Sequence, residues 1–337
     1  MRIIVDAFGG DHAPLEILKG CALAVQEYGV DILACGDEAK MRQVCQEQGV
    51  CLDRITLVNA PRVISPETDP VEVVKSYDDC SMAVGLKMLA NGEGDAFVSA
   101  GSTGAIAVGA SLYVKRIKGI KRAALATVIP CKGGCYLLVD VGANKECRPE
   151  MLSQFGIMGS LYMENILGVQ NPRVGTVNIG TEDNKGLELQ KLTNEQLQHA
   201  PVHFIGNVEP RELPFGGCDV AVCDGFTGNV ILKLTEGLGK WFADELRGIF
   251  TAGTASKLGY LLVRGGVSGF KNKMDYKEYG GAPFMGITRP VIKAHGSSDA
   301  RAFKNAIRQA KEYTERDVVS KIEQALAQVK RQQAVEG

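Results

Sequence analysis

The sequence has little of what marks an exported, membrane-spanning or nucleic-acid-binding protein. Residues 1–6 lack the apolar stretch and cleavage site of an export signal. No segment approaches the ~18 consecutive apolar residues of a membrane-spanning helix. The 38 basic and 39 acidic residues nearly cancel, so the overall charge gives no reason to expect a nucleic-acid partner. We therefore expect a cytoplasmic protein that meets lipid, if at all, at the membrane surface.

The signatures of several enzyme classes are also missing. There is no Walker loop, no Gly-x-Ser-x-Gly elbow and no His-Glu-x-x-His pair, which counts against a covalent serine hydrolase and a zinc hydrolase. The ten cysteines are scattered, and Cys131 and Cys135 have no matching pair at a zinc-finger spacing. We expect reduced thiols, no metal and no cofactor.

Short apolar runs rich in β-branched residues recur, each followed by a glycine or an acidic residue and then by a longer helical pattern. The runs are residues 3–5, 32–34, 96–99, 137–139, 174–179 and 220–223. This alternation is typical of βαβ units, and continuous apolar strands indicate a mostly parallel sheet covered by helices. The length fits one large or two modest domains, and the sequence shows no repeat and no long linker. We expect a single domain over residues 1–337.

In an open parallel sheet, ligands bind at the carboxyl ends of the strands, so polar residues after each strand are candidate site residues. The first strand is followed by Asp6, the pair Gly9 and Gly10, then Asp11 and His12. Paired glycines let backbone amides approach an anion at the start of a helix. A plain tight turn is an equally good interpretation.

A stronger candidate follows the run at residues 96–99. Ser99, Gly101, Ser102, Thr103 and Gly104 lead into a helical pattern of small residues. Hydroxyls and free amides at the start of a helix are complementary to phosphate or to a developing oxyanion. The alternative is that Ser102 or Thr103 only caps the helix. We favour the anion site, because small residues on both sides of the turn leave space for a ligand.

Three later strand ends carry glycine beside asparagine and aspartate. They hold Asp140 with Asn144, Asn178 with Glu182 and Lys185, and Asp224 with Gly228, Asn229 and Lys233. Each could be an ordinary turn, because these residue types favour turns for backbone reasons. Their recurrence at the presumed functional edge favours a shared pocket.

Near the carboxyl end, His295 and Ser297 belong to a His-Gly-Ser-Ser segment between an apolar run and a helical pattern. A lone histidine after a strand is often a packing or capping residue. The chain has only four histidines, and the adjoining Gly-Ser-Ser offers another candidate anion-binding helix start.

Residues 251–282 interrupt the alternation of strands and helices, because glycines alternate there with small apolar and basic residues. We expect a protruding helical excursion with an apolar tip at residues 260–263, flanked by Lys257 and Arg264. Such a tip suits shallow insertion into an anionic membrane, or an interface between two copies of the chain.

The motifs, taken in order, resemble the PlsX family of bacterial phosphate acyltransferases over nearly the whole chain. They are VDAFGGDHAP (residues 5–14), SAGSTGA (99–105), DVGAN (140–144), FIGNVE (204–209), CDGFTGN (223–229) and HGSS (295–298). The resemblance implies an α/β fold, a three-layer α/β/α Rossmann-like arrangement similar to phosphotransacetylases and isopropylmalate-type dehydrogenases, and a homodimer. One departure is at residues 75–80, where Ser76, Tyr77 and Asp78 weaken a segment that is basic in the family.

The resemblance also implies a reaction: reversible transfer of a long-chain fatty acyl group from acyl carrier protein to inorganic phosphate. The acyl phosphate would pass to a membrane glycerol-3-phosphate acyltransferase for phospholipid synthesis. Phosphate would attack the thioester carbonyl and expel a thiolate, so the protein must position phosphate and stabilise an oxyanion.

We assign phosphate binding to Ser102, Thr103 and Gly104, with help from Lys185. Asn144 and Asn229 are candidate oxyanion donors. His295 is the predicted general acid for the leaving thiolate, with Asp224 as its orienting partner. The wider predicted substrate site adds Asp6, Gly9, Gly10, Asp11, His12, Ser99, Gly101, Asp140, Asn178, Glu182, Gly228, Lys233 and Ser297.

Other functions stay open on the sequence alone. A short-chain phosphotransacetylase using coenzyme A would need the same phosphate pocket but a different thioester tunnel. A β-hydroxyacid dehydrogenase would need clustered metal-binding aspartates and a nicotinamide site, neither of which is evident. A membrane-associated scaffold has no need of polar strand-end motifs. Because acyl carrier proteins are acidic, the basic segment at residues 115–122 is either their docking surface or a solvated helix end.

Overall fold

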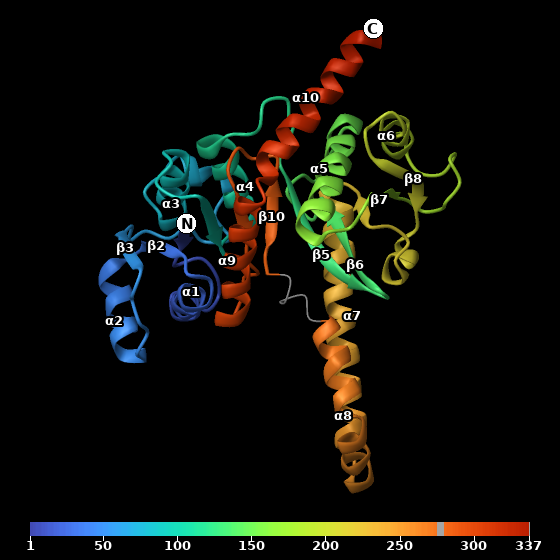
Figure 1. Cartoon of the computed structure of the whole chain (residues 1–337). Helices are drawn as coiled ribbons and strands as arrows, with labels where there is room; N and C mark the ends of the chain where they lie inside the picture. The colour runs from blue at the N-terminus through green and yellow to red at the C-terminus, as the bar shows by residue number, and fades with distance from the viewer. Residues whose placement is uncertain (275–279, 337) are drawn as a thin grey trace.

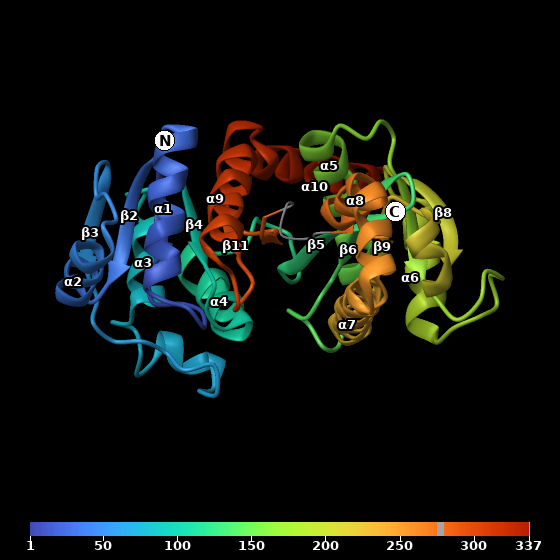
Figure 2. The same ribbon diagram turned by 90° about the horizontal axis from the view of Figure 1, so that it is seen from below.

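The computed structural model describes residues 1–274 and 280–336, which form one twisted sheet covered by helices (Figures 1 and 2). Its strands are β1 (Arg2–Asp6), β2 (Asp31–Gly36), β3 (Ile55–Asn59), β4 (Ala96–Ser99), β5 (Ala124–Cys131), β6 (Gly134–Val139), β7 (Arg173–Val177), β8 (His203–Val208), β9 (Val220–Val222), β10 (Ala282–Met285) and β11 (Val291–Lys293).

The described helices are α1 (Leu15–Tyr28), α2 (Glu38–Gln48), α3 (Ser81–Ala90), α4 (Thr103–Gly109), α5 (Pro149–Leu167), α6 (Glu188–Gln198), α7 (Gly225–Thr251), α8 (Thr254–Met274), α9 (Ala300–Glu315) and α10 (Val318–Glu336). Short helical segments are η1 (Pro70–Val74), η2 (Ala110–Val114) and η3 (Pro210–Phe215). In Figure 2, α1, α9 and α10 lie on one side of the sheet, and α4 and α7 lie on the other. The α/β class, the helical cover and the six predicted strands are confirmed.

The strand order is β3-β2-β1-β4-β11-β10-β5-β6-β9-β7-β8. The first five strands of this order are mutually parallel, and so are the last four. Between these blocks the pairs β11–β10, β10–β5 and β5–β6 are antiparallel. The chain direction therefore reverses three times across the centre. The prediction of a single functional edge, shared by all strand ends, is wrong.

The core explains why the strands read as unbroken apolar runs. Ile3, Ile4 and Val5 of β1 are fully buried, as are Phe97 and Val98 of β4. Side chains on alternate positions face opposite sides of a sheet, so burial of successive residues requires cover on both faces. The helices supply that cover, and the polar residues Asp6 and Ser99 at the ends of β1 and β4 are buried with the strands.

Helices α7 and α8 extend far beyond the sheet (Figure 1). The rings of Phe250 in α7 and Tyr260 in α8 pack in a tilted arrangement with centroids 5.3 Å apart. The predicted excursion is helical and protruding, but it begins within α7 rather than near residue 250, because Trp241 and Phe242 already stand more than half exposed. Residues 275–279 of the predicted excursion lie outside the described residues. Among the described residues, no helix has the length and apolar character to cross a membrane.

Candidate active site

The ends of β1, β4 and β11 converge on three glycine-containing turns. A Cβ at Gly9 would lie 2.5 Å from Asp6 Oδ2 and 2.7 Å from the Gly101 nitrogen, so only glycine fits between these segments. Gly10 has φ +107°, and a Cβ there would lie 3.0 Å from the Gly296 carbonyl oxygen. The Asp11 amide donates to that same oxygen at 2.8 Å. The predicted convergence of these motifs is therefore present in the first block.

Asp6 links these segments through hydrogen bonds. Its buried carboxylate accepts hydrogen bonds from Ser81 Oγ at 2.6 Å and from Ser99 Oγ at 2.7 Å. Ser99 Oγ in turn accepts from the Gly101 amide at 3.0 Å. Burial raises the pKa of Asp6 above its ordinary value, and the two serine hydrogen bonds oppose that rise. Asp6 and Ser99 thus shape the turn that begins α4, from positions that are closed to solvent.

Lys293 is a cation that the sequence analysis missed. It is the last residue of β11, and its Nζ lies 3.4 Å from the Ala100 carbonyl oxygen and also donates to the Ala294 carbonyl oxygen. Burial lowers the pKa of Lys293 to about 8, with nearby Lys233 adding to the fall and Asp11 opposing it. The signal for this residue was a lysine ending an apolar strand two positions before His295.

His295 is fixed by the turn that follows β11. Its Nδ1 accepts a hydrogen bond from the Ser297 amide at 3.2 Å, so the proton of the neutral ring is on Nε2. Ser297 Oγ lies 2.9 Å from the same Nδ1. Burial lowers the pKa of His295, against the opposing effect of Glu236. Near neutral pH the ring is therefore mainly neutral, with Nε2–H as its donor.

Helix α7 brings charged groups from the second block to His295. Glu236 Oε1 lies 4.0 Å from His295 Nε2, and Glu236 Oε2 accepts from Lys233 Nζ at 2.8 Å. The sequence analysis predicted Lys233 but missed Glu236, although the 229, 233, 236 spacing places all three on one helix face. The prediction that Asp224 orients His295 is wrong, because the acidic group beside the ring is Glu236.

Asp224 instead begins α7. Its carboxylate accepts from the Thr227 amide at 2.9 Å and from Thr227 Oγ1 at 2.7 Å, an N-cap that fixes the first turn of the helix. Gly228 follows one turn later, where a Cβ would lie only 1.9 Å from the Asp140 carbonyl oxygen. The start of α7 is therefore packed directly on the turn after β6.

That turn is organised by Asp140. Its fully buried carboxylate accepts from the amides of Leu125, Gly142, Ala143 and Asn144, and from Asn144 Nδ2 at 2.8 Å. Asn144 Nδ2 also donates to the Ala123 carbonyl oxygen at 2.7 Å. Because its amide hydrogens are engaged by the protein, Asn144 is a structural residue here rather than the free oxyanion donor predicted from sequence.

Asn229 is differently placed. It is exposed on α7, and a Cβ at Gly142 would lie 2.8 Å from its Nδ2. No hydrogen bond joins its side chain to another of the described residues 1–274 and 280–336. Asn229 is thus the predicted amide that stays available to a substrate, on the same helix face as Lys233.

The turn before α4 fits both interpretations of its sequence. Ser102 Oγ accepts from the Ala105 amide at 3.5 Å, so Ser102 caps α4, which begins at Thr103. A Cβ at Gly104 would lie 2.6 Å from Pro70 Cγ, so the segment after β3 packs closely on this turn. Phosphate binding by Ser102, Thr103 and Gly104 stays a prediction, at a helix start that lies beside Lys293.

Three predicted residues form a separate group at the end of β7. Asn178 is buried, and its Nδ2 donates to Asn207 Oδ1 at 2.9 Å and to the Lys185 carbonyl oxygen at 3.2 Å. The Glu182 carbonyl oxygen accepts from Asn207 Nδ2 at 2.9 Å. The Lys185 side chain is exposed, and in the described part of the chain no contact links it to His295 or Asn229. The catalytic role of Lys185 stays a prediction. Substrate binding by His12, which is exposed, also stays a prediction.

The fold is shared with solved structures of distant sequence. A phosphotransacetylase from Streptococcus pyogenes superposes with a TM-score of 0.64 at 16% identity, covering 95% of this chain and 94% of that one. A 4-hydroxythreonine-4-phosphate dehydrogenase from Klebsiella pneumoniae gives 0.51 at 11% identity, covering 93% and 99%. These likenesses establish a fold shared with phosphotransacetylases, as the resemblance implied, and with a dehydrogenase.

The family is narrower than the fold. A family model described as "Fatty acid synthesis protein" matches residues 1–321. A phosphate acyltransferase from Alkaliphilus oremlandii is 45% identical over 327 residues, 97% of this chain and 98% of that protein. One from Clostridium novyi is 44% identical over 329 residues, covering 97% and 99%. The chain belongs to this family, the PlsX phosphate acyltransferases, and the prediction made from its motifs is confirmed.

Proposed function

We propose that this protein transfers a long-chain fatty acyl group from acyl carrier protein to inorganic phosphate, near the turns that end β1, β4 and β11. The observation that supports this is the position of Lys293 and Lys233 beside His295, at a helix start lined by small residues. Two cations that repel each other in a partly buried site favour a bound dianion. Phosphate is such an anion and also the nucleophile.

The reaction assigns a task to each group. A phosphate oxygen forms a bond to the thioester carbon while the carbon–sulfur bond breaks, and the departing thiolate takes up a proton. Lys293 and Lys233 hold the phosphate, and the exposed amide of Asn229 is the candidate donor to the oxyanion. The neutral His295 donates a hydrogen bond from Nε2–H to that oxyanion and keeps its proton, because a neutral imidazole is far less acidic than a thiol of pKa about 8.5. The thiolate takes its proton from the attacking hydrogen phosphate, so it does not need the general acid predicted from sequence.

A direct assay tests the activity. The purified protein, incubated with palmitoyl acyl carrier protein and phosphate, should form palmitoyl phosphate detectable by mass spectrometry. His295→Ala should lower kcat by about 10²–10³-fold, as for the loss of one oxyanion donor, and Lys185→Ala tests the remote lysine. Near-normal turnover in His295→Ala would remove that residue from the mechanism. Faster turnover of acetyl coenzyme A than of palmitoyl carrier protein would instead favour a short-chain phosphotransacetylase.

We also propose that the acyl phosphate is consumed at the membrane by a glycerol-3-phosphate acyltransferase, which this protein meets as a cytoplasmic homodimer. Leu261 is 56% and Leu262 89% exposed near the end of the protruding helices, with Lys257 and Arg264 beside them. Such a tip suits an anionic bilayer surface. A Leu261→Glu, Leu262→Glu variant should lose flotation with anionic liposomes while light scattering still shows a dimer. Loss of the dimer would instead assign the tip to the subunit interface.

The basic segment at residues 115–122 is the candidate docking surface for the acidic carrier protein. Arg116 and Lys121 are both exposed, and Arg116 donates to the Lys121 carbonyl oxygen. Charge reversal at both positions should raise KM for acyl carrier protein. An unchanged KM would show that the segment is only a solvated surface.

A further inference from the structure

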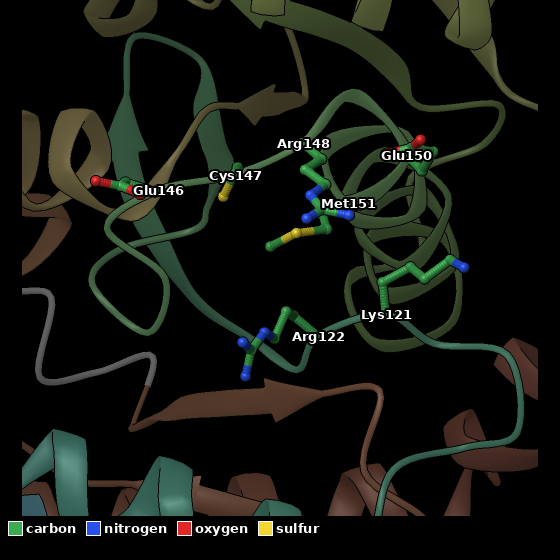
Figure 3. A pocket seen from close by; sticks show the side chains of 7 residues that line it. All are labelled: Lys121, Arg122, Glu146, Cys147, Arg148, Glu150 and Met151. Atoms are coloured by element: carbon green, nitrogen blue, oxygen red, sulfur yellow. The ribbon is translucent and has the colours of Figure 1, made fainter.

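A second polar region lies beside the start of α7, outside the group around His295, which adjoins the middle of that helix. A cavity of ≈ 430 Å³ opens there between the residues that precede β5 and the start of α5 (Figure 3). Three of its lining side chains are cationic, those of Lys121, Arg122 and Arg148, and two are acidic, those of Glu146 and Glu150. The phosphate-transfer site proposed above uses none of them.

Two of these cations, Arg122 and Arg148, are not paired with the acidic side chains of the cavity. Across residues 1–274 and 280–336, the side chains of Arg122 and Arg148 donate no hydrogen bond and form no ion pair. Figure 3 shows Arg148 directed toward the middle of the cavity and Glu146 directed away from it. Two unpaired guanidinium groups beside one cavity are suited to an anion, and a phosphate ester matches their forked geometry.

The cavity is joined to the candidate active site by hydrogen bonds and a helix. Cys147, on the cavity wall, donates to the Asn144 carbonyl oxygen at 3.7 Å, and the Gly225 amide donates to that same oxygen at 2.7 Å. From Gly225, α7 runs eleven residues to Glu236 beside His295, a distance of ~16 Å at 1.5 Å per residue. An inorganic phosphate bound in the cavity is therefore too far from His295 to react there.

We propose that this cavity binds the phosphate ester of a phosphopantetheine arm whose thioester end lies beside His295. This inference rests on the function proposed above, and it names the part of the acyl donor that the protein recognises. A long flexible arm can span the separation along α7, past Asn229 and Lys233. Met151, which is 7% exposed, and the half-buried Cys147 supply an apolar wall for the carbon chain next to the phosphate.

Two matched acyl donors test the proposal: palmitoyl pantetheine and palmitoyl 4′-phosphopantetheine, which differ only in the phosphate. The wild-type protein should prefer the phosphorylated donor. Arg122→Ser and Arg148→Ser should each raise KM for that donor by about tenfold or more, and leave KM for the other unchanged. Arg148→Lys, which keeps the charge but not the fork, should fall between. Lys132→Ser, in the exposed β5–β6 hairpin, is the charge control and should change neither KM.

The outcomes distinguish carrier protein from coenzyme A as the source of the arm. They also distinguish failure of the cavity inference from failure of the proposed function. Parallel increases in KM for palmitoyl acyl carrier protein and palmitoyl coenzyme A support recognition of the arm that both contain. An increase confined to coenzyme A, or confined to the carrier protein, overturns the inference, because Arg122 and Arg148 would then contact the adenosine or the protein. Equal increases in KM for palmitoyl pantetheine and palmitoyl 4′-phosphopantetheine also overturn it, because the effect would then not depend on the phosphate. Failure of the wild type to form acyl phosphate from any donor rejects the proposed function itself.

Discussion

Replacing Gly228 by alanine tests the packing that joins the two regions of the site. The new Cβ would lie 1.9 Å from the Asp140 carbonyl oxygen, so the helix and the turn must separate by at least 1.1 Å to reach a 3.0 Å contact. That movement overpacks the junction and strains the 2.7 Å hydrogen bond from the Gly225 amide to Asn144. Together these effects should lower the free energy of unfolding by about 2–4 kcal/mol.

The same helix provides a control. Gly248 has nothing within 4 Å of the position of a Cβ, so Gly248→Ala should raise the free energy of unfolding by about 0.5–1 kcal/mol through helix propensity alone. Urea denaturation of both variants measures the difference, and kcat of Gly228→Ala should fall as α7 shifts Lys233 and Glu236. Equal stabilities within about 0.5 kcal/mol would refute the close packing of α7 on Asp140.

Four further predictions concern the ionisable groups Lys293, His295 and Asp6. Because the pKa of Lys293 is about 8, kcat/KM should decline as pH rises through that value, and Lys293→Arg should remove this decline. The unfolded ammonium titrates near 10.5, so the unfolding free energy should also rise between pH 8 and 10.5, a rise that Lys293→Met should abolish. Glu236 raises the pKa of His295, so Glu236→Gln should move the acid limb of the kcat/KM profile to lower pH; an upward shift would contradict the pairing. Ser81→Ala removes a donor from buried Asp6 and should cost about 1–3 kcal/mol in thermal unfolding, against a negligible effect of the exposed Ser76→Ala.

Much of the fold follows from local pattern. The unbroken apolar runs at β1, β4 and β9 identify buried parallel strands, because only a sheet covered on both faces can bury successive residues. The order of the glycine motifs identifies the family, since each turn needs glycine for a positive φ or for close approach, as at Gly9 and Gly10.

Local pattern could not reveal the antiparallel centre of the sheet. Strands β5 and β10 are not among the predicted apolar runs, and nothing within their sequences records the direction of their neighbours. Neighbouring strands are twisted by ~20–25°, which adds up to roughly 100–125° over the five steps from β4 to β9. The carboxyl ends of the second block therefore do not point directly away from those of the first block. This geometry decides that α7 reaches the first block.

The sequence alone determined the residue types of the site, the strands that carry them and the family. Only the tertiary structure decided which polar groups meet. Glu236 rather than Asp224 lies beside His295. Lys293 lies in the site, and the Asn144 side chain is hydrogen-bonded within the turn after β6. The physical reason is that hydrogen bonds and charge pairs act within a few ångströms, whereas the groups they join here come from segments far apart along the chain.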